Sequence, residues 1–115
     1  MKFEGNLGEF EVLVLAALVR LGPEAYGVTI RSEIEERAGR EVSIGALYST
    51  LSRLEAKGLV ASKIGEPTPE RGGRAKRHYR IEPQGRLLLE QSLTAFRRMA
   101  QGIIVWPEPA KGKAK

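Results

Sequence analysis

Basic side chains gather in one short stretch of the sequence, residues 71–80. Its members are Arg71, Arg74, Lys76, Arg77 and Arg80, and no acidic residue interrupts them. Such a run attracts phosphates, and Gly72 and Gly73 let the backbone approach a phosphate closely. A solvated loop can have the same composition, so the run indicates nucleic-acid binding only together with its neighbours.

A short helix precedes the basic run, and both of its ends are marked. Ser43 can accept a hydrogen bond from a free backbone N–H one turn on, and Gly58 fits the left-handed position just past a helix end. Apolar residues at steps of three and four predict a buried stripe of Ile44, Leu47, Leu51 and Leu54. The opposite face is then small and polar, and consists of Gly45, Ser49, Ser52, Arg53 and Ala56. Small side chains let a helix approach base edges in a major groove, so we interpret this face as the one that reads DNA.

The basic run belongs to a predicted hairpin. Residues 59–64 and 76–81 have the pattern of two paired strands, and the prolines and glycines between them predict a long loop. Tyr79 alternates with Ile81 on one strand face and is expected in the core, which leaves His78 outward as a solvated residue. A capped helix followed by a basic hairpin is typical of a recognition helix with a wing that contacts the DNA backbone.

The remaining segments complete a helical frame. Residues 8–21 predict a strongly apolar helix and residues 28–38 a second one, which a short link joins to the capped helix as a helix-turn-helix pair. The fold class is therefore mainly α with a small β-hairpin. The predicted domains are a winged helix-turn-helix over 1–82, a C-terminal dimerisation helix over 83–106, and a disordered basic tail over 107–115. Pro83 suits the first turn of that last helix, which is expected to run to about residue 105.

The dimerisation prediction rests on apolar spacing. Along the last helix the spacing predicts a seam that consists of Leu89, Leu93, Phe96, Ala100 and Ile103. Phe10 and Leu13 belong to the first helix, which has more apolar surface than a chain of 115 residues can cover alone. The alternative is that the two helices pack only on each other within one subunit.

Composition limits the other functions. The formal net charge is +5, and there are no cysteines, so a disulfide framework and a thiolate metal site are both excluded. With one histidine, His78, and no phosphate-binding glycine loop, no nucleophile and base pair can be proposed, so we predict no enzyme, metal or cofactor. No secretory signal pattern is found, and no apolar run approaches the ~20 residues that span a membrane, so a cytoplasmic location is expected.

Taken in order, these motifs resemble the PadR-like winged-helix transcriptional regulators. The resemblance lies in Tyr26-Gly27, residues 42–48 (VSIGALY), residues 51–60 (LSRLEAKGLV), Gly73-Arg74, and residues 77–81 (RHYRI) leading to Gly85. It covers nearly the whole chain, and the short last helix is similar to the compact subgroup. Many members have proline where this chain has Ser49, so the helix is expected to be less constrained there.

The resemblance implies a homodimeric repressor that binds double-stranded DNA at a palindromic operator. The implied DNA contacts are Ser43, Gly45, Tyr48, Ser49, Ser52, Arg53, Arg71, Arg74, Lys76 and Arg77. Tyr48 can equally pack at the edge of the apolar stripe, and both roles are compatible. The competing function is a winged-helix module that binds a protein partner, or nucleic acid without sequence preference.

A small aromatic effector is a further implication. Some PadR-like regulators sense aromatic compounds near the dimer interface, which would place Trp106, in the apolar cluster 103–106, at a ligand pocket. Packing in the core or at the end of the helix is the alternative account of this tryptophan.

Overall fold

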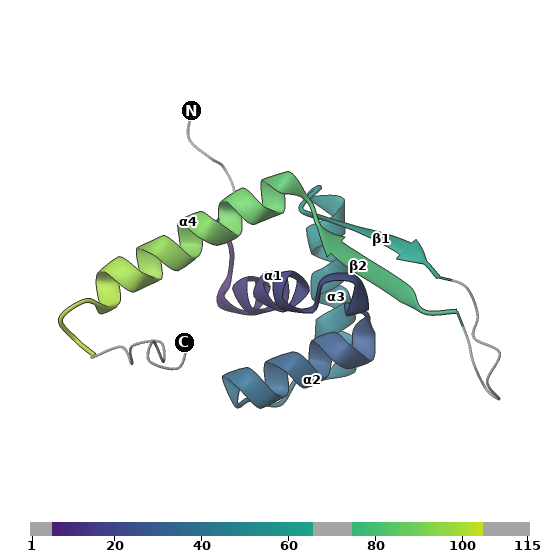
Figure 1. The fold of residues 1–115 in the computed structure, drawn as a ribbon, viewed down its shortest axis with the longest axis horizontal. Helices are drawn as coiled ribbons and strands as arrows, with labels where there is room; N and C mark the ends of the chain where they lie inside the picture. Colours follow the sequence, from purple (N-terminus) through teal and green to yellow (C-terminus); the bar gives the residue numbers. More distant parts are fainter. Residues whose placement is uncertain (1–5, 66–74, 105–115) are drawn as a thin grey trace, which may run out of the picture.

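The computed structural model describes residues 6–65 and 75–104 of the chain. The elements follow one another in the order predicted for a winged helix with a C-terminal helix (Figure 1). They are α1 (Glu9–Leu21), the 3-10 turn η1 (Gly22–Glu24), α2 (Gly27–Ala38), α3 (Ile44–Ala56), β1 (Val60–Ile64), β2 (Arg77–Ile81) and α4 (Pro83–Ala100). Arg71, Arg74, Trp106 and the tail 107–115 lie outside the described residues.

Helix α1 lies at the centre of the molecule. It contacts α2, α3, α4 and β2, which explains why its sequence is apolar on most sides. Figure 1 shows α4 crossing on one side of α1 and α2 on the other, with the hairpin and the far end of α4 extending in opposite directions. Val14 and Leu15 of α1 are fully buried, whereas Phe10 and Leu13 pack at the edge of the core.

The ends of α3 follow the local sequence signals. The hydroxyl of Ser43 accepts a hydrogen bond from the Ala46 N–H at 3.1 Å. Past the helix, Gly58 has a φ of 78°, its N–H donates to the Glu55 carbonyl at 3.0 Å, and the Leu59 N–H donates to the Leu54 carbonyl at 3.0 Å. This pair of bonds is a Schellman motif, so both predicted helix ends are confirmed.

The predicted buried stripe of α3 was wrong at one residue. Ile44 is 43% exposed, and Thr50 is buried with Leu47, Leu51 and Leu54 instead. At about 100° per residue, Ile44 and Thr50 flank the stripe of Leu47, Leu51 and Leu54 on opposite sides. Because Ile44 is also the first residue of the helix, it lies at the edge of the core.

Strand β2 is the middle of a small three-segment layer. It pairs antiparallel with β1, in a register that places Val60 opposite Ile81 and Ser62 opposite Tyr79. On its other edge the Tyr79 N–H donates to the Ala25 carbonyl at 2.9 Å, and Tyr26 forms an isolated bridge with His78. Tyr79 is buried, as its alternation with Ile81 predicted. The hairpin is therefore attached to the segment that precedes α2 as well as to α3.

Helix α4 is shorter than predicted. It ends at Ala100 and not near residue 105, because Gln101 is extended and Gly102 turns the chain with a φ of 83°. Ile103, assigned to the helical seam, therefore lies outside the helix and is exposed. Only the first turns of α4 join the core, through Leu88 and Leu89.

Gly85 sets how closely α4 approaches the hairpin. A Cβ at this position would meet the Leu59 carbonyl, with the carbonyl carbon at 3.1 Å, and the Ile81 side chain at 3.0 Å. The start of α4 therefore packs directly on the backbone that leads into β1. This contact explains why the chain has glycine two residues after Pro83.

Candidate nucleic-acid interface

The middle of the outward face of α3 has only small side chains. Gly45, Ser49, Ser52 and Ala56 are all exposed, and steps of three and four residues place them on one side of the helix. No heavy atom lies within 4 Å of a Cβ built at Gly45, so this end of the face is open. A helix with such a face can bring its backbone close to base edges.

Tyr48 flanks this face and packs on the first turn of α2. A Cβ built at Gly27 would contact the Tyr48 hydroxyl and lie 2.9 Å from the ring carbon Cζ. The ring therefore occupies the space that a side chain at residue 27 would need. Because Tyr48 remains 41% exposed, it packs against the fold and also presents part of its surface next to Ser49.

Arg53 lies on the other flank, next to α1. Its Nε is 3.5 Å from Glu11 Oε2, and its Nη2 donates to the Thr50 hydroxyl at 3.3 Å. Lys57 Nζ is also 3.5 Å from Glu11 Oε2. The sequence pattern placed Arg53 on the outward face, and in the structure its guanidinium is turned toward α1.

Glu11 is a residue that the sequence analysis missed. It is only 7% exposed, and its Oε1 accepts a hydrogen bond from the Gly8 N–H at 2.8 Å. Burial alone would raise the pKa of Glu11, but the Gly8 N–H, Lys57 and Arg53 together outweigh burial and leave that pKa lowered. The available signal was the position of a glutamate three residues after a helix start, which is typical of a capping box.

The hairpin is tied to the end of α3 by a chain of hydrogen bonds. Arg77 Nη1 donates to the Ser62 hydroxyl at 2.9 Å, and this hydroxyl donates to Glu55 Oε2 at 2.9 Å. Lys76 Nζ lies 4.5 Å from the centre of the Tyr26 ring. Both predicted wing cations in the described region, Lys76 and Arg77, are thus held where the strands meet the loop, while remaining exposed.

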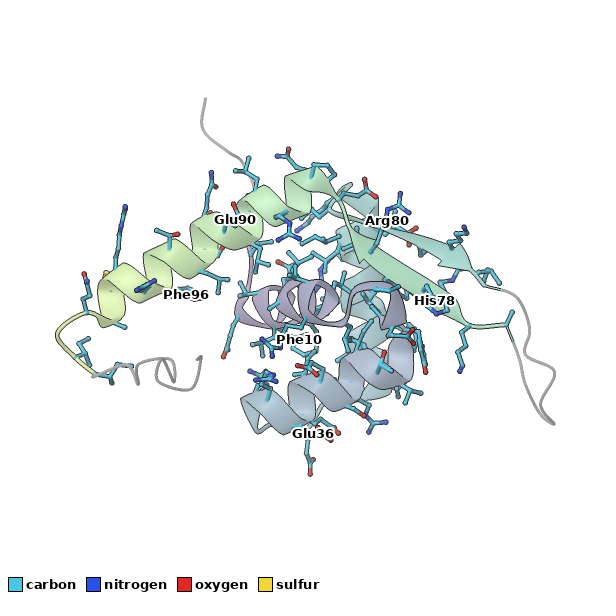
Figure 2. The ribbon with its side chains drawn as sticks, in the orientation of Figure 1. Phe10, Glu36, His78, Arg80, Glu90 and Phe96 are labelled. Atoms are coloured by element: carbon cyan, nitrogen blue, oxygen red, sulfur yellow. The ribbon has the colours of Figure 1, made fainter. Side chains whose placement is uncertain are left out.

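His78 was wrongly predicted to be solvated. It is half-buried, and its ring meets the Tyr26 ring edge-on with centroids 5.2 Å apart. Figure 2 labels His78 and Arg80 on β2, the strand of the hairpin that contacts α1. The strand alternation was read correctly, but Ala25 and Tyr26 cover the edge of β2 next to His78.

The predicted dimerisation residues fall into two groups. Leu89 is buried in the subunit, and Phe10, Leu13 and Ala100 are half-buried. Leu93 and Phe96 are exposed on the part of α4 that extends past α1, where Figure 2 labels Phe96. α1 and α4 contact each other within the subunit, and dimerisation through the exposed residues of α4 stays a prediction.

Within residues 6–65 and 75–104, no group of three or more His, Cys, Asp or Glu side chains is placed to hold a metal ion. No helix in the same part of the chain has the length and apolar character to cross a membrane. The cytoplasmic location stays a prediction.

Comparison with known proteins gives one consistent answer. Residues 14–91 match the family model described as the transcriptional regulator PadR-like family. "Transcriptional regulator Rv3488" of Mycobacterium tuberculosis (strain ATCC 25618 / H37Rv) is 39% identical over 81 residues, which are 70% of this chain and 71% of that protein.

Solved structures agree with the family match. A PadR family transcription regulator from Clostridium difficile R20291 superposes with a TM-score of 0.68 at 26% identity, over 82% of this chain and 93% of the other. A transcriptional regulator from Clostridium thermocellum gives 0.66 at 26% identity, over 81% and 84%. These similarities confirm the winged-helix fold with its C-terminal helix.

Proposed function

The chain belongs to the PadR-like family of transcriptional regulators, and we propose that it acts as a repressor that binds a palindromic operator as a homodimer. Membership of a family of DNA-binding regulators confirms that the chain is not an enzyme. In the proposal, α3 reads base edges in the major groove and the hairpin contacts the phosphate backbone.

The outward face of α3 carries the proposal. Ser49 and Ser52 are exposed in the middle of a helix whose neighbours on this side are Gly45 and Ala56. A helix that only faced water would more often have long charged side chains there, which favour solubility but keep the backbone away from a groove. The Arg77–Ser62–Glu55 connection supports a fixed angle between the hairpin and α3, which simultaneous contact with groove and backbone requires.

The homodimer is supported by the exposed apolar residues of α4. Leu93 and Phe96 lie one turn apart beyond the core, and Met99 and Ile104 add further exposed apolar surface near the helix end. Apolar surface that extends from a subunit is typical of a protein interface. A two-fold dimer would present two copies of α3, which matches two half-sites of a palindrome.

An aromatic effector at Trp106 stays a prediction of the family resemblance. Trp106 is the single tryptophan of the chain, so its fluorescence reports directly on any compound that binds beside it. A series of planar aromatic compounds should quench this fluorescence and change the affinity for DNA. An unchanged signal and unchanged DNA affinity across the series would count against the effector.

Selection of bound DNA from a random pool at physiological salt tests the proposed function. A repressor with its own operator should enrich one two-fold symmetric sequence and prefer it to random DNA by several orders of magnitude. The competing function, a winged-helix module that binds proteins or any nucleic acid, predicts no enriched sequence. An enriched site without two-fold symmetry would contradict the homodimer.

A further inference from the structure

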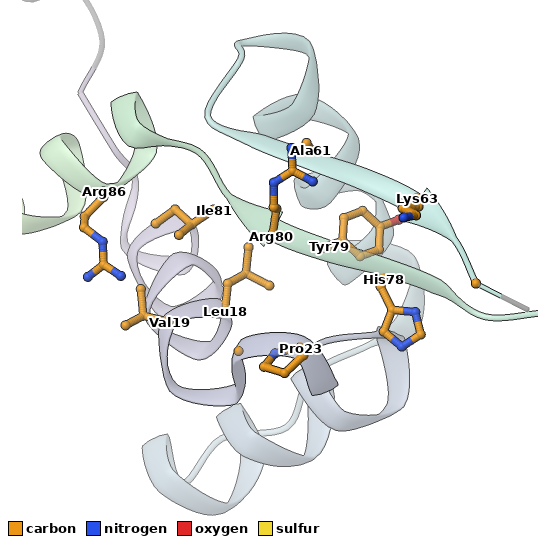
Figure 3. Close-up of a pocket in the computed structure, with 12 residues that line it drawn as sticks. Leu18, Val19, Pro23, Ala61, Lys63, His78, Tyr79, Arg80, Ile81 and Arg86 are labelled. Atoms are coloured by element: carbon orange, nitrogen blue, oxygen red, sulfur yellow. The ribbon is translucent and has the colours of Figure 1, made fainter.

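A cleft of about 590 Å³ lies between the hairpin, the end of α1 and the start of α4, and no residue of α3 lines it (Figure 3). Its walls come from the end of α1, the turn η1, both strands and the start of α4. This volume is within the range of small-molecule sites in proteins, roughly 300–1,000 Å³. The cleft does not involve the exposed part of α4.

The wall of the cleft is apolar in the middle. Leu18 and Val19 from α1, Pro23 from η1 and Ile81 from β2 line it. Figure 3 shows these side chains between Arg86 at one end and His78 at the other. An apolar body that covers this wall would gain roughly 25 cal/mol for each Å² of apolar surface removed from water.

The rim of the cleft is cationic. Arg86, Arg80 and Lys63 line it together with His78. Arg80 is partly neutralised by Glu82, with Nη2 and Oε2 3.2 Å apart. No carboxylate of the described residues lies within 4 Å of the charged groups of Arg86 or Lys63, although Glu82 and Glu90 border the far side of Arg86.

Figure 3 shows the direction of one of these cations. Arg86 is exposed and extends from the first turns of α4 toward Val19, so its guanidinium lies at the rim next to the apolar wall. A guanidinium in this position can donate two parallel hydrogen bonds to a carboxylate. The tail of such a ligand would then lie along Leu18, Pro23 and Ile81.

From this arrangement we propose that the cleft binds a small carboxylate with an apolar tail, held by Arg86 at the acid group and by the α1–η1–β2 wall along the tail. The proposal concerns a site separate from the α3 face and from the exposed part of α4 around Leu93 and Phe96, and it does not depend on the operator. Both halves of the ligand contribute to binding. The cationic rim selects a ligand with a carboxylate, and the apolar tail supplies the buried contact area.

A titration with three probes tests the site. Octanoate has acid and tail, octanamide has the tail without the charge, and acetate has the charge without the tail. Each is added to the full ¹⁵N-labelled chain while the backbone amide signals are followed. We expect octanoate to shift the amides of Val19, Gly22, Ala61 and Arg80, with an affinity at least tenfold above octanamide and acetate.

Variants locate the binding. Arg86→Gln should lower the affinity for octanoate about tenfold. Should this variant perturb α4, Lys63→Gln in β1 provides a second test from another wall of the cleft. Arg97→Gln is the matched control, since Arg97 is an exposed arginine of the same helix outside the cleft, and it should leave the affinity unchanged. Shifts confined to residues 87–104, equal affinity for acetate, or full affinity in both cleft variants would overturn the proposal.

Discussion

The ring of Tyr48 in α3 occupies the space above Gly27 in α2, so that a side chain on Gly27 would collide with it. This contact joins the two helices of the helix-turn-helix through one glycine and one aromatic residue. It also determines where Tyr48 lies relative to Ser49 and Ser52 on the proposed DNA-reading face.

Gly27→Ala should therefore destabilise the protein. The added methyl meets the hydroxyl end of Tyr48, a partly exposed side chain that can swing aside more easily than backbone, so we expect a cost of about 1 kcal/mol in the free energy of unfolding, at the low end for overpacking. Urea unfolding measures the change. Gly45→Ala is the control, because its Cβ has no neighbour within 4 Å and alanine favours a helix by roughly 0.5–1 kcal/mol over glycine. In a Tyr48→Ala background the cost of Gly27→Ala should largely disappear, and a cost that persisted there would mean that the collision is elsewhere.

Gly85→Ala should separate α4 from the hairpin. The methyl would meet the backbone carbonyl of Leu59, which cannot move aside as a side chain can. We expect a loss of about 1–3 kcal/mol in the free energy of unfolding and altered amide signals at Leu59 and Ile81. A stable variant with unchanged signals there would contradict the close packing of α4 on this turn.

The lowered pKa of Glu11 gives a pH dependence. A carboxylate whose pKa is lower in the folded protein contributes stability that is complete above the unfolded pKa and is lost as the pH falls through the folded pKa. Glu11→Gln should cost about 1–2 kcal/mol at neutral pH, and this difference from the native protein should shrink below about pH 4. Unfolding measured across pH 3–7 checks it.

Glu9→Gln is the control for Glu11. Glu9 pairs with Arg40 at 3.1 Å, but its carboxylate is largely exposed, so its removal should change stability by less than about 0.5 kcal/mol. If the two variants lost the same stability with the same pH profile, the burial of Glu11 and its pairing with Arg53 and Lys57 would not matter to folding.

Dimerisation should depend on the exposed stripe of α4. Leu93→Asp or Phe96→Asp places a charge in the proposed interface, and sedimentation at micromolar concentration should show the shift from dimer to monomer. Leu87→Asp is a matched control, because Leu87 is 47% and Leu93 45% exposed but Leu87 lies on another side of the helix. A native monomer, or a dimer that resists both seam variants, would rule out this interface.

Local signals made much of the fold predictable from sequence. Ser43 and Gly58 marked the ends of α3 because caps depend on hydrogen bonds within a few residues. The prediction failed at Gly102. The apolar residues after it were expected to continue the helix, whereas α4 ends at Ala100 and Gly102 has a positive φ.

The site was less predictable because its contacts join distant parts of the chain. Glu11 and Arg53 are 42 positions apart, and Gly27 and Tyr48 lie on different helices. The spacing of apolar residues predicted which residues of α3 face outward. It did not predict that the side chains of Arg53 and Tyr48 turn back to contact α1 and α2. The Arg77–Ser62–Glu55 connection likewise requires the hairpin to pack on α3 before it can form.

The central claim is that α3 reads the sequence while the wing supplies affinity. The decisive measurement is the ratio of dissociation constants for the selected operator and for random DNA, taken for the native protein and for three variants. Ser49→Ala and Ser52→Ala, at the two exposed serines of the outward face, should lower the discrimination by about 1–3 kcal/mol where a base contact is lost. Arg74→Ala should weaken both complexes nearly equally and reduce the salt dependence by about one unit of slope. Unchanged discrimination in both α3 variants, with discrimination lost in Arg74→Ala, would show that the wing is the reader and would contradict the account.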